Sequence, residues 1–179
     1  ARGLFPEGLM IEGRDKKAQQ YTEELINEKK TIIFQPIFVK DGFLAAADVL
    51  KLNQETGGYT IYVIKSAGSV KPEYLYDVAF QTVLLKRCGL KIDGVNIVHL
   101  NKNYVRHGKL NVEELFTIAD LTPQAAEIAD VVTQQMETAK VYLTVEAEPT
   151  GPCSCIYKGR SNHCRTFAYS NPQVPEYGV

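Results

Sequence analysis

Apolar and polar positions in the first third of the chain predict one amphipathic helix followed by a group of strands. Between Gly13 and Lys29, apolar residues recur at helical spacing among Lys, Gln and Glu. The segments 31–40 and 43–52 are rich in β-branched and aromatic residues, and Asp41-Gly42 between them is a hairpin signal. After a polar turn with paired glycines, the segment 59–66 is apolar on both faces, as in a central strand. We therefore expect three strands in a meander.

The rest of the chain predicts a crossover helix and a parallel strand. Pro72 to Cys88 has a helical stripe of apolar residues, with Pro72 suited to the first turn and Gly89 to the stop. The segment 91–100 predicts a strand parallel to 59–66, so the expected fold is α/β, with a mixed β-sheet flanked by helices. Three further elements are predicted: a short strand at 103–106, a helical turn at 111–116, and a helix that Thr122-Pro123 opens as N-cap and N1 and that runs to about Val145.

Composition indicates a globular protein with no strong electrostatic field. The 179 residues are 45% hydrophobic and 23% charged, which suits one domain with a real core. Twenty basic and twenty-one acidic residues give a net charge of -1, so a nucleic-acid partner would need a local basic patch. The sequence has neither an apolar run of about 20 residues nor a signal-peptide core, so we expect a cytoplasmic protein with no membrane partner. Because the chain opens on Ala1 rather than Met, we expect residues upstream.

We expect two parts of unequal size. Residues 1–149 hold all the predicted helices and strands and form the α/β domain. Residues 150–179 are loop-like and contain three of the four cysteines. This second segment is expected to form a tail that packs on the domain or extends it.

An Asp and a Lys fall on neighbouring, otherwise apolar strands. If the turn between segments 43–52 and 59–66 is centred between Glu55 and Thr56, Asp48 lies opposite Val63, and Lys65 shares that face. A buried charge is costly unless it is paired or bound to a metal ion. Two interpretations stay open: a functional pair, or an Asp that closes a strand end and a Lys in water at the sheet rim.

The order of these features resembles the PD-(D/E)XK nuclease superfamily, and most closely its RecB-like exonuclease branch. The features are Asp48, a glycine turn, a strand that ends in Lys65-Ser66, and a helix with Asp77 and Gln81. Similarity to a bacterial family of that branch is found in the segments LFPEG, FLAAADVL, IKSAGSVK, YLYDVAFQTVLLKRCGL, VHLNKNYVRHGKL and the cysteine tail. The resemblance covers nearly the whole chain and implies a restriction-endonuclease-like fold.

The resemblance also implies a metal-dependent hydrolysis of phosphodiesters in DNA or RNA. Mg²⁺ or Mn²⁺ would be held by Asp48, by the backbone carbonyl of Ile64 and by a second carboxylate. Lys65 would stabilise the charge that develops on the phosphate. Gln81 matches a helical glutamine that helps to organise such sites, whereas Leu85 stands where that motif has tyrosine.

The chain departs from the motif at two carboxylates. Val63 stands where the motif has Glu, and Gln35 where related proteins often have an acidic residue. A hard cation gains most from anionic oxygens, so one Asp beside Val and Gln is a poor Mg²⁺ site. The missing acid is expected on the helix, at Asp77 or, less favoured, at Glu73, although the alternative for both is a solvated charge near a helix N-terminus.

The cysteine tail is a second candidate site. Cys153, Cys155 and Cys164 fall within twelve residues, and the resemblance implies an iron–sulfur cluster held by C-terminal cysteines. The fourth ligand would come from residues before Ala1, from Cys88, or from His163, and His163 would make the site more like a zinc site. Three free thiols are the plain interpretation.

Basic residues gather after the segment 91–100. Lys102 and Arg106, with His107 and Lys109 nearby, predict contact with a nucleic-acid backbone, although short charge runs are usually solvated surface. Three classes of function remain open: a metal-dependent nuclease, a catalytically silent nuclease fold that binds nucleic acid or protein, and a structural accessory domain of a larger protein.

Overall fold

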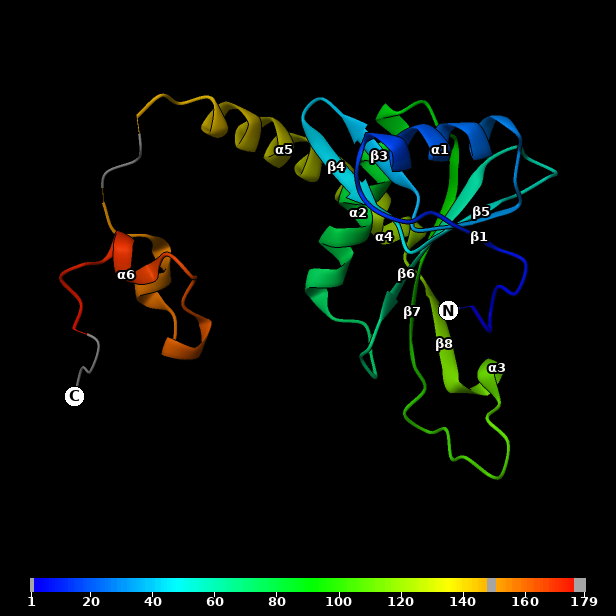
Figure 1. Ribbon diagram of the computed structural model, residues 1–179. Helices are drawn as coiled ribbons and strands as arrows, with labels where there is room; N and C mark the ends of the chain where they lie inside the picture. The colour runs from blue at the N-terminus through cyan, green and yellow to red at the C-terminus, as the bar shows by residue number, and fades with distance from the viewer. Residues whose placement is uncertain (1, 148–150, 176–179) are drawn as a thin grey trace. The chain divides into compact units, whose positions relative to one another are not determined.

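The computed structural model describes residues 2–147 and 151–175 (Figure 1). The chain divides into two compact units, Ala1–Lys140 and Val141–Val179. The domain boundary predicted between residues 149 and 150 falls outside the described residues and stays a prediction. No helix among the described residues is long and apolar enough to cross a membrane.

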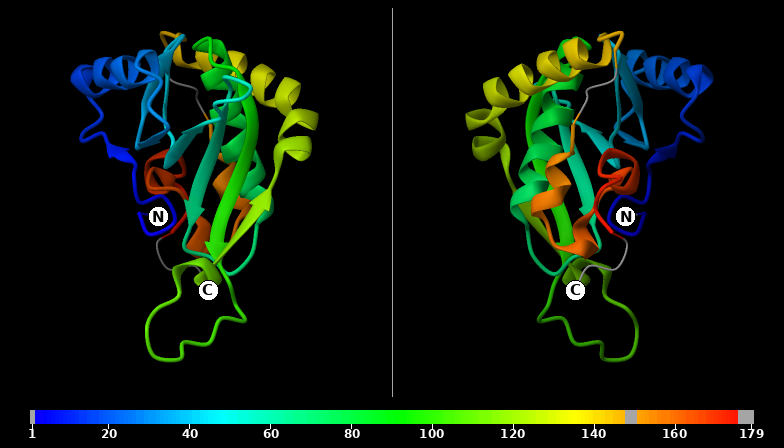
Figure 2. Two further views of the ribbon diagram at one scale, coloured as in Figure 1. Left: turned by 90° about the vertical axis from the view of Figure 1, so that its right-hand side faces the viewer. Right: turned by 90° about the vertical axis from the view of Figure 1, so that its left-hand side faces the viewer.

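The larger unit is built on a six-stranded mixed sheet. The strand order is β1-β2-β5-β6-β7-β8, with β1 parallel to β2, β6 parallel to β7 and the other neighbours antiparallel. The strands are β1 (Leu9–Met10), β2 (Ile32–Phe34), β5 (Val49–Leu52), β6 (Tyr59–Lys65), β7 (Ile92–Leu100) and β8 (Phe116–Asp120). The long strands β6 and β7 run side by side through the centre of the unit (Figure 2). The predicted α/β class with a mixed sheet and flanking helices is confirmed.

The predicted hairpin around Asp41-Gly42 is present, but it bends out of the main sheet. Its tip is a separate two-stranded sheet of β3 (Ile37–Lys40) and β4 (Phe43–Ala46). Asp41 and Gly42 have φ angles of 54° and 86°, the positive pair that a tight two-residue hairpin turn requires. At the bend, the N–H of Ala47 donates to the carbonyl of Pro36 at 3.2 Å, so pairing continues around the corner.

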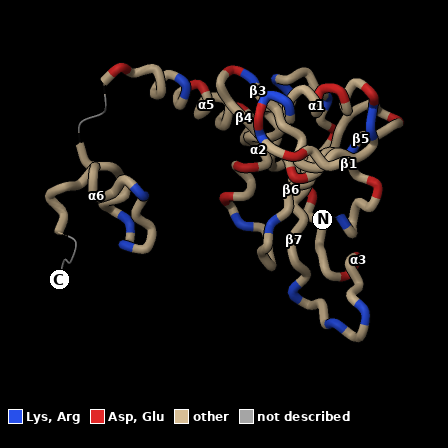
Figure 3. The backbone as a smooth tube through the Cα atoms, in the orientation of Figure 1, with Lys and Arg blue, Asp and Glu red and all other residues tan. Residues whose placement is uncertain are grey.

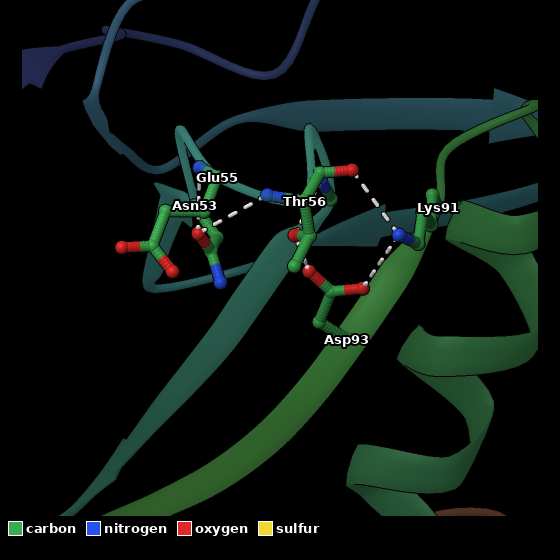
Figure 4. A network of polar contacts seen from close by, with 6 residues as sticks. Asn53, Glu55, Thr56, Lys91 and Asp93 are labelled. Carbon is green, nitrogen blue, oxygen red and sulfur yellow. Dashed lines mark hydrogen bonds and ion pairs between the residues drawn. The ribbon is translucent and has the colours of Figure 1, made fainter.

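The register between β5 and β6 is the one that the sequence predicts. Val49 pairs with Tyr62 and Leu50 with Ile61, which places Asp48 opposite Val63 just beyond the end of the ladder. A polar network ties the β5–β6 turn to β7 (Figure 4). Asp93 accepts a hydrogen bond from the Thr56 hydroxyl, and Lys91 donates to the Thr56 carbonyl at 3.1 Å. A side chain of the neighbouring strand β7 therefore helps to fix the turn.

Two helices pack on the sheet as predicted. Helix α1 (Lys16–Asn27) starts at Asp15, whose carboxylate accepts a hydrogen bond from Ala18 N at 2.9 Å. Helix α2 (Pro72–Arg87) begins with Pro72 in its first turn and is followed by Gly89 at φ 88°. It links the parallel strands β6 and β7, as a crossover connection must.

The predictions beyond β7 are only partly correct. The helical turn is present as α3 (Val112–Leu115), but residues 103–106 form a loop and not a strand. The outer strand is β8, which the sequence did not predict. The last helix is divided at Ile128 into α4 (Thr122–Glu127) and α5 (Ala129–Leu143). The N-cap of α4 is Leu121 and not Thr122, which is the first residue of the helix and whose N–H and hydroxyl both donate to Asp120.

The core lies mainly between α2 and the sheet. Val78, Leu84 and Leu85 of α2 are completely buried in one cluster with Ile61 and Ile97 of the central strands. A second cluster holds residues that alternate with these along the strands, and Phe5 from the N-terminal segment joins it. Since α2 follows β6 and packs back on the sheet, Lys65 at the end of the strand meets Asp77 in the first half of the helix, and this contact builds the candidate site.

The smaller unit contains little regular structure among its described residues. It consists of two single turns of 3-10 helix, η1 (Ser154–Tyr157) and η2 (Arg160–Asn162), and the short helix α6 (Phe167–Ser170). Cys155 and Asn171 are the buried residues in its described part. None of the three hydrophobic core clusters includes a described residue of this unit.

Candidate functional site

Asp48 lies in the bend between β4 and β5, and two neighbours fix its carboxylate. Its Oδ2 accepts a hydrogen bond from the backbone N–H of Ile64 at 2.7 Å. Its Oδ1 accepts one from the side-chain amide of Gln35 at 3.0 Å. The side chain is half-buried. Both carboxylate oxygens are thus oriented by the protein, and each keeps a lone pair for another partner.

The corner that presents Asp48 is conformationally strained. Gln35, which precedes Pro36, has a φ angle of 54°, a region that non-glycine residues rarely adopt. Such positions cost on the order of 1–3 kcal/mol and tend to lie at functional sites. In the sequence, Gln35 stands out only as the position of a missing acid. The Gln-Pro dipeptide inside an apolar run was the available signal for this corner.

Lys65, Asp77 and Gln81 form a second group at the end of β6. The Lys65 ammonium contacts Asp77 Oδ2 at 2.5 Å, and the Gln81 amide donates to Asp77 Oδ1 at 3.0 Å. The ring of Tyr74 lies 5.2 Å from the ammonium nitrogen, within cation–π range. Asp77 and Gln81 are one helical turn apart on α2, as the sequence suggested. The helix thus supplies a carboxylate to the lysine that ends the strand.

Gln81 is buried rather than solvated. Its side chain is 7% exposed, and its Oε1 has no hydrogen-bond partner. Leaving a buried acceptor unsatisfied costs about 1–3 kcal/mol. A donor group from water or a ligand would remove this cost.

The strand residues between the two groups have different surroundings. Val63 is 2% exposed and belongs to the core, so no polar group stands at the motif's Glu position. Ile64 donates its N–H toward Asp48, and in a strand the carbonyl of the same residue points to the same side. The β5–β6 ladder ends at Val49 and Tyr62, so this carbonyl lies beyond the last strand pair. Glu73 is exposed on α2.

The acidic residues of this region form no large cluster. Within residues 2–147 and 151–175, the cysteine trio is the group in which three or more His, Cys, Asp or Glu ligand atoms approach within 4.8 Å. Neither Asp48 nor Asp77 therefore belongs to a group of three carboxylates in the described part of the chain. A cation here would complete its shell with the Ile64 carbonyl, water and substrate oxygens.

A basic loop extends from the same end of the sheet. Lys102 follows β7, and its aliphatic carbons pack so close to Gly68 that a Cβ there would lie 2.5 Å from Lys102 Cε. Gly68 follows Lys65 by three residues, so Lys102 lies near the end of β6. Figure 3 shows further Lys and Arg along this loop. Arg106, His107 and Lys109 are all exposed there.

The three tail cysteines come together in the smaller unit. The sulfur atoms of Cys153, Cys155 and Cys164 lie within 4.8 Å of one another, so the trio can hold a metal ion. The hydroxyl of Thr166 and the neighbouring Cys155 lower the pKa of the Cys164 thiol to about 7. His163 is outside this group: its ring stacks on another residue, and its Nε2 lies 3.1 Å from the Lys158 carbonyl.

Comparison with known proteins gives distant structural matches and no sequence match. No protein-family model matches the chain, and no curated protein sequence does. Among solved structures, the chain is similar to an alkaline exonuclease from Laribacter hongkongensis, with 15% sequence identity and a TM-score of 0.35. The match covers 69% of this chain and 66% of that one, slightly less than two thirds of the exonuclease. A likeness this distant assigns neither a family nor an activity.

Proposed function

We propose that this protein is a divalent-metal-dependent nuclease with a restriction-endonuclease-like fold, which hydrolyses phosphodiester bonds in DNA or RNA. The observation that carries the proposal is the contact of Lys65 with Asp77. It restores a carboxylate next to the strand lysine although Val63 has removed the expected one. Asp48 accepts a hydrogen bond from Ile64, the residue that precedes Lys65 on β6.

The donors at Asp48 suit Mg²⁺ or Mn²⁺. These ions take oxygen ligands, and proteins commonly hold Mg²⁺ through one or two carboxylates, with water and substrate phosphate in the other positions. Such oxygens are supplied by the carboxylate of Asp48 and by the Ile64 carbonyl. Each oxygen of Asp48 is already oriented by one hydrogen bond. Asp77 is the candidate second carboxylate. When bound, the ion would make water a better nucleophile and offset phosphate charge.

The remaining residues act on the phosphate and on one another. Lys65 carries a positive charge at the end of β6. There it can donate a hydrogen bond to a phosphate oxygen and stabilise the negative charge that develops on it. Gln81 holds Asp77 Oδ1 and so fixes the orientation of that carboxylate. The unpartnered Gln81 oxygen can accept a hydrogen bond from an ordered water at the site.

The first test is cleavage of end-labelled single- and double-stranded DNA and RNA in Mn²⁺ or Mg²⁺. Lys65→Ala is expected to cleave about 100-fold more slowly than the unchanged protein, because it lacks the charge that stabilises the transition state. Lys51→Ala, an exposed lysine of β5, is the matched control and should cleave normally. Equal cleavage by the unchanged protein and Lys65→Ala, or no cleavage of any substrate by folded protein, would overturn the proposal.

A second candidate is a catalytically silent fold that binds nucleic acid. The observation that favours it is the buried Val63 together with the lack, in the described part of the chain, of a three-carboxylate group. Lys65 is also neutralised by Asp77, as in a structural ion pair. Oligonucleotide binding by folded protein that cleaves no substrate in the assay above would select this candidate.

Both candidates predict a role for the basic loop. Lys102→Ala is expected to weaken binding of a fluorescein-labelled oligonucleotide for all sequences, because one phosphate contact is lost. The slope of the logarithm of affinity against the logarithm of salt concentration should fall by about 1. Fluorescence anisotropy at several salt concentrations measures both effects. Lys17→Ala, an exposed lysine of α1, is the control. An unchanged slope for Lys102→Ala would exclude that contact.

A further inference from the structure

The spacing of the sulfur atoms in the smaller unit distinguishes between kinds of metal site. All three thiols are free, and the sulfur atoms of Cys153 and Cys164 are 3.9 Å apart. A disulfide would need about 2.05 Å. Two thiolates on one tetrahedral zinc ion, each about 2.3 Å from it, lie about 3.8 Å apart. In a four-iron cluster each thiolate binds its own iron, so the sulfurs lie further apart. The observed spacing matches two thiolates on one metal atom.

Polar side chains around the three cysteines lie where they can donate hydrogen bonds to thiolate sulfurs. Asn171 has no exposed surface, and its side-chain amide donates to Cys153 Sγ at 3.3 Å and to the Phe167 carbonyl at 3.0 Å. The Thr166 hydroxyl lies 3.4 Å from Cys164 Sγ. Donors aimed at ligand sulfurs orient them and offset their negative charge, and such partners typically change metal affinity 10–100-fold.

The smaller unit also lacks another source of stability in its described residues. Its short turns, η1, η2 and α6, bury Cys155 and Asn171 and add nothing to a hydrophobic cluster. Segments of this size generally need a disulfide or a metal ion to hold one conformation. A buried cysteine and a buried amide that contacts a cysteine are residues expected around a bound metal ion.

We propose that Cys153, Cys155 and Cys164 bind one zinc ion, with a solvent water as the fourth ligand. This site is independent of the proposed nuclease activity. It replaces the iron–sulfur cluster that the sequence resemblance implied. It also leaves out His163, whose ring packs on Phe167 with centroids 3.6 Å apart. A zinc site with three protein ligands keeps one position that small ligands can exchange into.

The test is metal binding by the full chain. Protein stripped with a chelator under reducing conditions is titrated with Zn²⁺ against a chromophoric competitor, and metal content is measured by mass spectrometry. One zinc per chain is expected. Cys153→Ser or Cys164→Ser should raise the zinc dissociation constant at least about 100-fold over that of the unchanged protein. This exceeds the effect of losing a residue that only supports a ligand. Cys88→Ser, which lies in the larger unit, is the matched control and should bind normally.

Two further measurements identify the site. Asn171→Ala should weaken zinc binding about 10-fold, whereas Asn162→Ala, in the exposed turn η2, should not. Substitution with Co²⁺ should give the visible bands of a tetrahedral thiolate site. Three results would each overturn the proposal. The first is iron with acid-labile sulfide in freshly purified protein, and the second is a Cys153–Cys164 disulfide in protein that binds no zinc. The third is loss of zinc binding in Cys88→Ser.

Discussion

Substitution of Asp48 with Asn is expected to slow metal-dependent cleavage by about 1,000-fold while the fold stays intact. Asn is nearly the same size and keeps one oxygen, which can accept from the N–H of Ile64 as Asp48 Oδ2 does. It has no negative charge, and a hard divalent cation gains most of its binding from anionic oxygens. The effect should exceed that of Lys65→Ala, because the ion itself would be lost.

Cleavage rates at several Mn²⁺ concentrations, with Mn²⁺ binding by calorimetry, measure this effect. Glu55→Gln, which neutralises an exposed acid in the β5–β6 turn, is the control and should keep both activity and binding. Asp77→Asn with its exposed helix neighbour Glu73→Gln forms a second matched pair, in which only Asp77→Asn should lose activity. Full activity in Asp48→Asn would exclude Asp48 as a metal ligand.

Substitution of Leu84 with Ala is expected to lower the free energy of unfolding of the larger unit by about 3 kcal/mol. Leu84 lies on the buried face of α2 with no exposed surface, inside the largest core cluster. The smaller side chain loses its transfer free energy and leaves a cavity between helix and sheet. Because α2 also carries Asp77 and Gln81, the site loses stability with the core.

Urea unfolding followed by circular dichroism measures this loss, since the chain has no tryptophan. Lys86→Ala, two residues further along the same helix and exposed, should change the unfolding free energy by less than about 0.5 kcal/mol. A loss below about 1 kcal/mol for Leu84→Ala would mean that α2 is not packed on the sheet as described.

Local patterns were sufficient for most of the central elements. The segment 59–66 is apolar on both faces because β6 is covered by α2 on one side and by the N-terminal segment on the other. The register of β5 and β6 followed from the turn between them, since a shift of one residue would turn every side chain to the opposite face. Pro72 and Gly89 marked α2 correctly, because each suits one end of a helix.

The elements that differ from the sequence-based predictions have weak local signals. Strand β8 lies at the edge of the sheet, where Ile118 is 50% exposed, so its alternation does not separate buried from solvated positions. The break at Ile128 has no Pro or Gly to mark it. Thr122 had the residue type of an N-cap, but Asp120 on β8 accepts its hydrogen bonds, and this depends on where the edge strand ends.

The sequence by itself determined the fold class, the central strands, the helix between them, and the candidates Asp48, Lys65, Asp77, Gln81 and the three cysteines. Periodicity carries this information because burial on one face repeats along a segment. Only the tertiary structure decided which candidates meet: Lys65 with Asp77, Asp48 with Gln35 and Ile64, and Cys153 with Cys164 and Asn171. These contacts join separate elements, so they depend on packing and on the strained corner at Gln35, neither of which a local pattern records.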